Sequence, residues 1–160
     1  MSELPGPSGT AVGIIADLVR DHGLSGIDPK EDTILQVVLE GETQVLLVFA
    51  DDICFMHGGV AETGEALLQN PWLVFNAPNG WADRRTRLAV EPETERPVLI
   101  RDLFLDGMTY GEFTEALAVF AEDVETAKSI VGPKKAGAPV TDGLDPALDG
   151  AFSDYTLLRP

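Results

Sequence analysis

The sequence predicts an α+β fold in which an antiparallel twisted sheet of five or six strands is flanked by helices. Three observations support this prediction. Apolar residues recur at helical spacing near both ends of residues 8–131, and short apolar runs separated by turn residues fill the middle of that range. The length of 160 residues suits one domain with its own core.

We therefore expect a flexible leader at residues 1–7, a single domain at residues 8–131 and a tail at residues 132–160. The tail is rich in Gly, Pro and Asp, and we expect it to be largely disordered or docked only at its end. A small apolar cluster near that end comprises Phe152, Tyr155, Leu157 and Leu158.

The first helix is predicted to begin after Ser8, a residue type that caps helices well. Its apolar face comprises Val12, Ile15, Leu18 and Val19, and Gly23 supplies the end signal.

Three strands are predicted next, at residues 33–40, 44–50 and 53–57. Short polar connections between them are typical of an antiparallel meander. The middle run is apolar on both faces, so it is predicted to be the central strand, covered on both sides by helices or by a partner.

A short helix is predicted at residues 62–69, ending before Pro71, followed by a strand at residues 72–75. Two further strands are predicted at residues 85–91 and 98–105. The last helix begins after Thr109, with Glu112 in the capping-box position. Its apolar stripe comprises Phe113, Leu117, Phe120 and Val124, and its acidic outer face comprises Glu112, Glu115, Glu122, Asp123 and Glu125.

The charge excludes some partners. Asp and Glu number 27 against 11 Lys and Arg, which gives a formal net charge of −16. Such a field repels nucleic acid and anionic membranes, and it favours a basic or amphipathic polypeptide or serves solubility alone. No Lys or Arg lies between Lys30 and Arg84, whereas five arginines lie from Arg84 to Arg101. These arginines either orient a partner or pair with nearby acids.

Cys54 is the only cysteine, so no intrachain disulfide can form, as is typical of a reducing compartment. The N-terminal residues lack the pattern of a signal peptide, and the longest apolar run, residues 45–50, is far too short to span a membrane. We expect a cytoplasmic protein.

Candidate chemistry is sparse. Cys54 and His57 could form a nucleophilic or metal-binding pair in a small hydrolase, but in a strand their side chains point to opposite faces. A metal site needs more ligands than this pair offers, and no phosphate-binding loop is present. We therefore expect a non-catalytic binding protein with no cofactor.

The order of elements resembles the class I type III secretion chaperones, the Tir-chaperone (CesT-like) family. The residues that carry the resemblance are residues 15–19, 34–39 and 45–50, Glu65-Ala-Leu-Leu-Gln-Asn70, residues 87–91 and residues 113–122. The resemblance covers roughly residues 8–131.

This resemblance implies a homodimer that binds the N-terminal segment of a secreted effector polypeptide in extended form. It implies a dimer interface at Leu67, Leu68, Trp72 and Val74. It implies polypeptide-binding residues at Val12, Ile15, Val19, Leu35, Val37 and Val48. An adaptor or regulatory protein-binding domain of the same fold outside secretion is the alternative.

Overall fold

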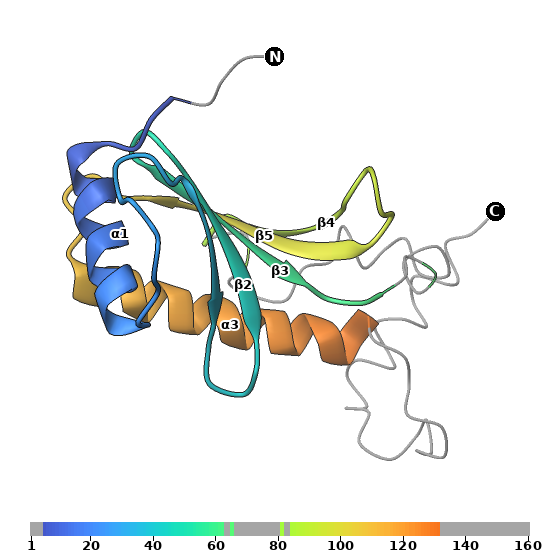
Figure 1. Cartoon of the computed structure of the whole chain (residues 1–160). Coiled ribbons are helices and arrows are strands. Elements are labelled where there is room, and N and C mark those ends of the chain that lie inside the picture. Colours follow the sequence, from blue (N-terminus) through green and yellow to red (C-terminus); the bar gives the residue numbers. More distant parts are fainter. Residues whose placement is uncertain (1–4, 63–64, 66–80, 82–83, 132–160) are drawn as a thin grey trace.

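The structure is a computed structural model that describes residues 5–62, 65, 81 and 84–131 (Figure 1). Its elements are α1 (Gly9–Asp21), β1 (Ile34–Val38), β2 (Gln44–Ala50), β3 (Ile53–Gly59), β4 (Thr86–Val90), β5 (Pro97–Phe104) and α3 (Tyr110–Val131). Within these residues, no helix is both long enough and apolar enough to span a membrane. The predicted short helix falls almost entirely outside the described residues, and the strand at residues 72–75 lies wholly outside them.

The five strands form one antiparallel sheet in the order β1-β2-β3-β5-β4, which confirms the predicted α+β class. The prediction that residues 44–50 form the central strand is wrong. β3 is central, because β5 pairs with β3 and places β4 at the far edge. Within the described residues, helices cover only one face of β2, because its residues alternate between buried and exposed along most of the strand. Cover of the other face by a partner stays a prediction. In an antiparallel sheet, one face can pack against helices while the other face contacts solvent.

Helix α1 begins as predicted. The Ser8 side chain accepts a hydrogen bond from the Ala11 backbone N–H, which satisfies a donor that the first turn would otherwise leave unpaired. Backbone hydrogen bonds join Gly6 and Ser8 to Asp51, so the start of the helix is attached to the β2–β3 turn. The buried residues of α1 are Ala11, Ile14, Ile15 and Leu18.

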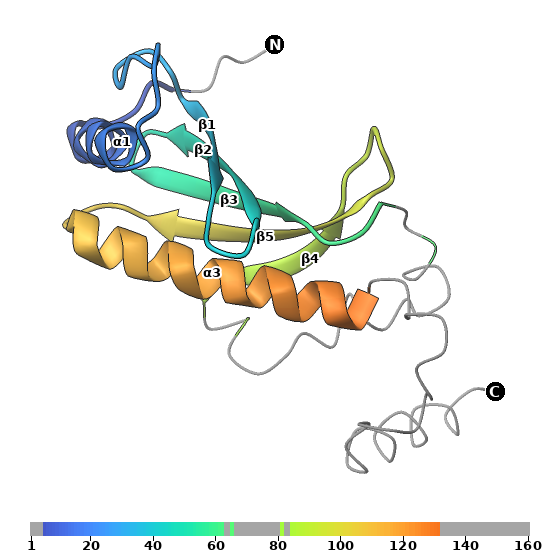
Figure 2. The same cartoon turned by 60° about the horizontal axis from the view of Figure 1, so that its bottom comes forward.

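Helix α3 also begins as predicted, because Glu112 accepts hydrogen bonds from both the backbone and the hydroxyl of Thr109. The helix runs along one face of the sheet, and α1 contacts it (Figure 2). Asp123 was predicted on its acidic outer face, and that prediction is wrong. The side chain is buried against the sheet, where Arg84 donates to both of its oxygens at 2.9 and 3.1 Å.

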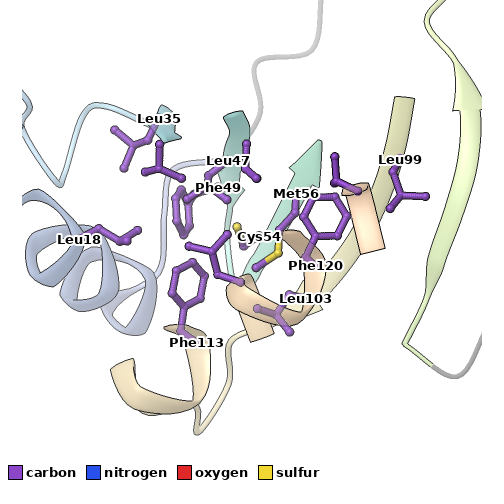
Figure 3. Close-up of a cluster of buried hydrophobic side chains, with 14 of the residues drawn as sticks. Leu18, Leu35, Leu47, Phe49, Cys54, Met56, Leu99, Leu103, Phe113 and Phe120 are labelled. Carbon is purple, nitrogen blue, oxygen red and sulfur yellow. The ribbon is translucent and has the colours of Figure 1, made fainter. Parts of the chain in front are cut away.

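The core lies between this face of the sheet and the two helices (Figure 3). The rings of Phe49 in β2 and Phe113 in α3 pack with their centroids 6.2 Å apart. Gly58 in β3 lies beneath Val124, and a Cβ atom at this position would overlap the Val124 side chain. A glycine here therefore lets α3 approach the backbone of the central strand closely.

Candidate functional site

The face of the sheet that points away from α1 and α3 carries several exposed apolar side chains; we call it the open face. Ile34 and Val38 of β1 are 60% and 56% exposed, Leu46 of β2 is 39% exposed, and Phe104 of β5 is 48% exposed. The register places Val48 beside Ile34 and Phe55 beside Val48, which extends the apolar strip across three strands. Exposed apolar strips of this kind commonly mark interaction surfaces.

The sheet divides at one end of this face. The β2–β3 ladder stops at the pair Leu46–His57. In contrast, the β1–β2 ladder continues to the pair Val38–Gln44, and the β3–β5 ladder continues to the pair Gly59–Val98. The β1–β2 and β4–β5 hairpins therefore diverge, and Figure 1 shows their turns in different directions. We call the space between these hairpins the fork.

A groove of about 600 Å³ occupies the fork. Its lining comprises Glu42, Gln44, Gly59, Val60, Ala61, Glu62, Glu91, Arg96, Val98 and Lys128. A second hollow of about 200 Å³ adjoins it on the open face and shares Gln44, Gly59, Glu91 and Val98 with it. Gly59 contributes no side chain, and a Cβ atom built on it would meet nothing within 4 Å.

The charges of the groove are partly neutralised. Arg96 pairs with Glu62 at 3.4 Å, and Lys128 pairs with Glu125 at 2.8 Å. Among the described residues, Glu42 and Glu91 form no ion pair within 4.0 Å, so the β1–β2 turn and the β4–β5 turn each present a carboxylate.

His57 lies in the adjoining hollow, beside Leu46 on β2 and Ile100 on β5. Burial lowers the pKa of its imidazole, and the positive charge of Arg87 lowers it further, whereas Glu91 and Asp102 oppose that shift. Near neutral pH, His57 is therefore an uncharged, half-buried part of the open face.

The predicted polypeptide-binding residues are separated by the fold. Ile15, Leu35 and Val37 are fully buried between α1 and the sheet, whereas Val12, Val19 and Val48 are half-buried. Of the six, Val48 alone belongs to the open face. The binding role of all six stays a prediction, and the buried three could contact a ligand directly only if the core opened.

No prediction from the sequence placed Ile34, Val38, Leu46 and Phe104 on a binding surface. A signal was present, because Gln36 lies two residues from both Ile34 and Val38 in the same strand. Residues two apart share a face, so polar residues mark the side of a strand that is not packed in the core. The predicted interface residues Leu67, Leu68, Trp72 and Val74 lie outside the described residues.

The pair formed by Cys54 and His57 is divided between the two faces, as strand alternation predicts. Cys54 lies in the core, where burial raises the pKa of its thiol, and a protonated thiol is a poor nucleophile and metal ligand. In the described part of the chain, no group of three or more His, Cys, Asp or Glu side chains could hold a metal ion.

The arginines from Arg84 to Arg101 are mostly engaged within the domain. Arg84 pairs with Asp123 at 2.9 Å, and Arg87 pairs with Asp102 at 3.0 Å. The guanidinium carbon of Arg85 lies 4.5 Å from the centroid of the Phe104 ring. These arginines were predicted either to orient a partner or to pair with nearby acids. Pairing within the domain accounts for these contacts.

The chain shares its fold with several solved structures. A chain of the ExsC–ExsE complex superposes with a TM-score of 0.59 at 15% identity, covering 78% of this chain and 95% of that chain. A chain of the ExoT–SpcS complex from Pseudomonas aeruginosa gives a TM-score of 0.50 at 17% identity, covering 77% and 97%. A chain of the heterodimeric ExoU–SpcU complex from the type III secretion system of Pseudomonas aeruginosa gives 0.48 at 12% identity, covering 65% and 87%. By sequence, no family model and no curated protein matches the chain.

These neighbours are type III secretion chaperones. The resemblance predicted from the order of elements is therefore confirmed for the fold, with its five-stranded antiparallel sheet and flanking helices.

Proposed function

We propose that this protein is a non-catalytic, chaperone-like homodimer that binds the N-terminal segment of a secreted effector polypeptide. The observation that carries the proposal is the open face, where apolar side chains from β1, β2 and β5 stand exposed on a rigid sheet. An extended polypeptide can bury such side chains without requiring any catalytic group.

Two further observations support the proposal. The fold is shared with chains solved in the ExsC–ExsE and ExoT–SpcS complexes. The net charge of −16 keeps a protein with an exposed apolar face soluble, and it favours a basic or amphipathic client over nucleic acid.

The client can be tested by affinity capture from the native cell with wild-type protein and with Leu46→Asp. Leu46 is 39% exposed, so the change should cost only about 1–2 kcal/mol, from the partly lost packing and the low strand propensity of Asp. We expect the wild type to capture one dominant exported polypeptide and Leu46→Asp to lose it. Capture of cytosolic regulators alone would contradict the secretion role and support the adaptor alternative.

The homodimer can be tested by size-exclusion chromatography with light scattering at micromolar concentration. We expect twice the chain mass of 17.1 kDa. The substitution Trp72→Ala should shift the mass toward the monomer, since aromatic residues commonly dominate interfaces. A strictly monomeric wild type would contradict the dimer, while leaving client binding to be judged by the capture experiment.

A further inference from the structure

We infer that the fork receives one extended segment of the client, with a small residue over Gly59 and a Lys or Arg residue on either side of it. This inference rests on the proposed function and specifies the chemistry of the client. Three features of the groove support it: its exposed backbone groups, its shape and its charge.

The backbone of Gly59 points into the fork. Leu105 N–H donates to Asp52 C=O at 2.8 Å, and Val60 N–H donates to Pro97 C=O at 3.0 Å. Alternate residues of an antiparallel strand direct their peptide groups to the same neighbour. Asp52 and Val60 are both even-numbered, so the even-numbered residues of β3 direct their backbone N–H and C=O groups toward β5. The backbone groups of Gly59 therefore point toward the side of β2.

The backbone of Gln44 points into the fork from the opposite side. Phe49 N–H donates to Thr33 C=O at 2.7 Å, so the odd-numbered residues of β2 direct their backbone groups toward β1. The backbone groups of Gln44, an even-numbered residue, therefore point toward β3. The β2–β3 ladder has already ended at Leu46. The fork thus exposes backbone groups of β2 and of β3 that no neighbouring strand pairs, and an extended segment crossing the fork could hydrogen-bond to them.

The shape of the groove selects the central residue of that segment. Val60 and Val98 supply apolar lining, and the missing side chain of Gly59 leaves the floor open next to Gln44. A client backbone can approach closely at this point, with Gly, Ala or Ser at the position nearest to Gly59.

The charge of the groove selects the flanking residues. Glu42 belongs to the β1–β2 hairpin and Glu91 to the β4–β5 hairpin, and both line the groove while the acid Glu62 is paired with Arg96. A segment crossing the fork passes one carboxylate on each hairpin. Lys or Arg side chains on both sides of the small residue complement these charges, whereas acidic residues are repelled.

The test compares two end-blocked, fluorescein-labelled peptides, Arg-Val-Thr-Val-Gly-Val-Thr-Val-Arg and the same sequence with Glu at both ends. We expect the wild type to bind the Arg peptide at least about tenfold more tightly by fluorescence anisotropy. Glu42→Gln combined with Glu91→Gln should remove most of this difference. Equal binding of the two peptides, or no binding of either, would overturn the inference.

Gly59→Leu tests whether binding occurs in the fork. The side chain enters open space, so the melting temperature should change little while binding of the Arg peptide falls at least about tenfold. Gly13→Leu is the matched control, because Gly13 is exposed on α1 and also has nothing within 4 Å of an added Cβ atom. Unchanged binding by Gly59→Leu would overturn the inference.

The two proposals fail differently. If the wild type captures an exported client but binds the Arg and Glu peptides equally, only the selectivity of the fork is wrong. If the Arg preference is observed but no exported client is captured, only the secretion role is wrong. If Gly59→Leu halves the mass measured by light scattering, the fork is an interface between two copies of the chain, and the inference is wrong.

Discussion

The covered face and the open face of the sheet are built from alternate residues of the same strands. On the covered face, Phe49 packs on Phe113 within a cluster of buried apolar side chains. On the open face, Ile34 and Leu46 are comparably apolar and remain exposed. The hydrophobicity of a strand therefore does not determine which of its faces the fold seals. The packing of the helices determines it.

The same contrast occurs between two consecutive residues of β3. Gly58 faces α3, and its missing side chain is required because Val124 occupies that space. Gly59 faces the fork, and its missing side chain leaves open space. One glycine serves packing, whereas the other leaves a surface accessible. Substitutions on the two faces should therefore affect stability very differently.

The largest expected effect is that of Phe113→Ala on the covered face. Removing this buried ring should lower the free energy of unfolding by about 3–5 kcal/mol, because it leaves a cavity against Phe49. Leu46→Ala on the open face is the control and should cost less than about 1 kcal/mol. Urea denaturation followed by circular dichroism measures both values, and similar losses would show that the open face is also packed.

Gly58→Ala should lower the free energy of unfolding by about 1–3 kcal/mol, because the added methyl group overlaps Val124 and forces α3 away from β3. Gly59→Ala adds the same methyl group to open space and should change stability by no more than about 0.5 kcal/mol. Thermal melts of the two variants provide the comparison. A larger loss for Gly59→Ala than for Gly58→Ala would contradict the assignment of the faces.

Thr109→Ala weakens the start of the helix that covers the sheet. Its hydroxyl is bonded to Glu112, and its loss should cost about 1 kcal/mol. Hydrogen exchange should increase in the first turn of α3 and remain unchanged in β1, which does not depend on that turn. Faster exchange throughout the sheet would mean that the first turn of α3 stabilises the whole domain and not only the start of the helix.

The smallest effect concerns pH and the open face. The pKa of His57 is lowered from its ordinary value of 6.5, first by burial and then by Arg87. The folded state therefore binds this proton less readily than the unfolded chain does. The resulting stabilisation is present above about pH 6.5 and is lost as the pH falls through the lower folded-state value.

Titration of the His57 ring protons by NMR should give this lowered pKa, and Arg87→Gln should raise it. His57→Gln should make stability less sensitive to acid in the same pH window. A pKa above 6.5 would show that Glu91 and Asp102 outweigh burial at this position.

Local signals in the sequence predicted the starts of both long helices and the positions of the described strands. Ser8, Thr109 and Glu112 form caps with their own neighbours, so no knowledge of distant residues was needed. The strand order could not be predicted in this way. Nothing local to residues 86–90 and 97–104 indicates that β5, and not β4, pairs with β3.

The site was harder to predict for the same reason. Asp123 was placed on an acidic helix face by its spacing, but the distant residue Arg84 holds it against the sheet. The fork depends on where one ladder stops while two others continue, and each of these ends involves residues far apart in the chain. The alternation of Gln36 with apolar neighbours was the one local sign of the open face.

The attachment of the N-terminal residues to the β2–β3 turn has a practical consequence for reagents. Gly6 and Ser8 bond to Asp51 at the end of the sheet opposite Gly59, whereas α3 brings Lys128 to the groove shortly before its last residue, Val131. An affinity handle or fluorophore joined upstream of Gly6 is therefore held at a distance from incoming polypeptide. The same label attached to Lys128 would crowd the groove, so a label at the N-terminal end suits capture experiments better than a label on this lysine.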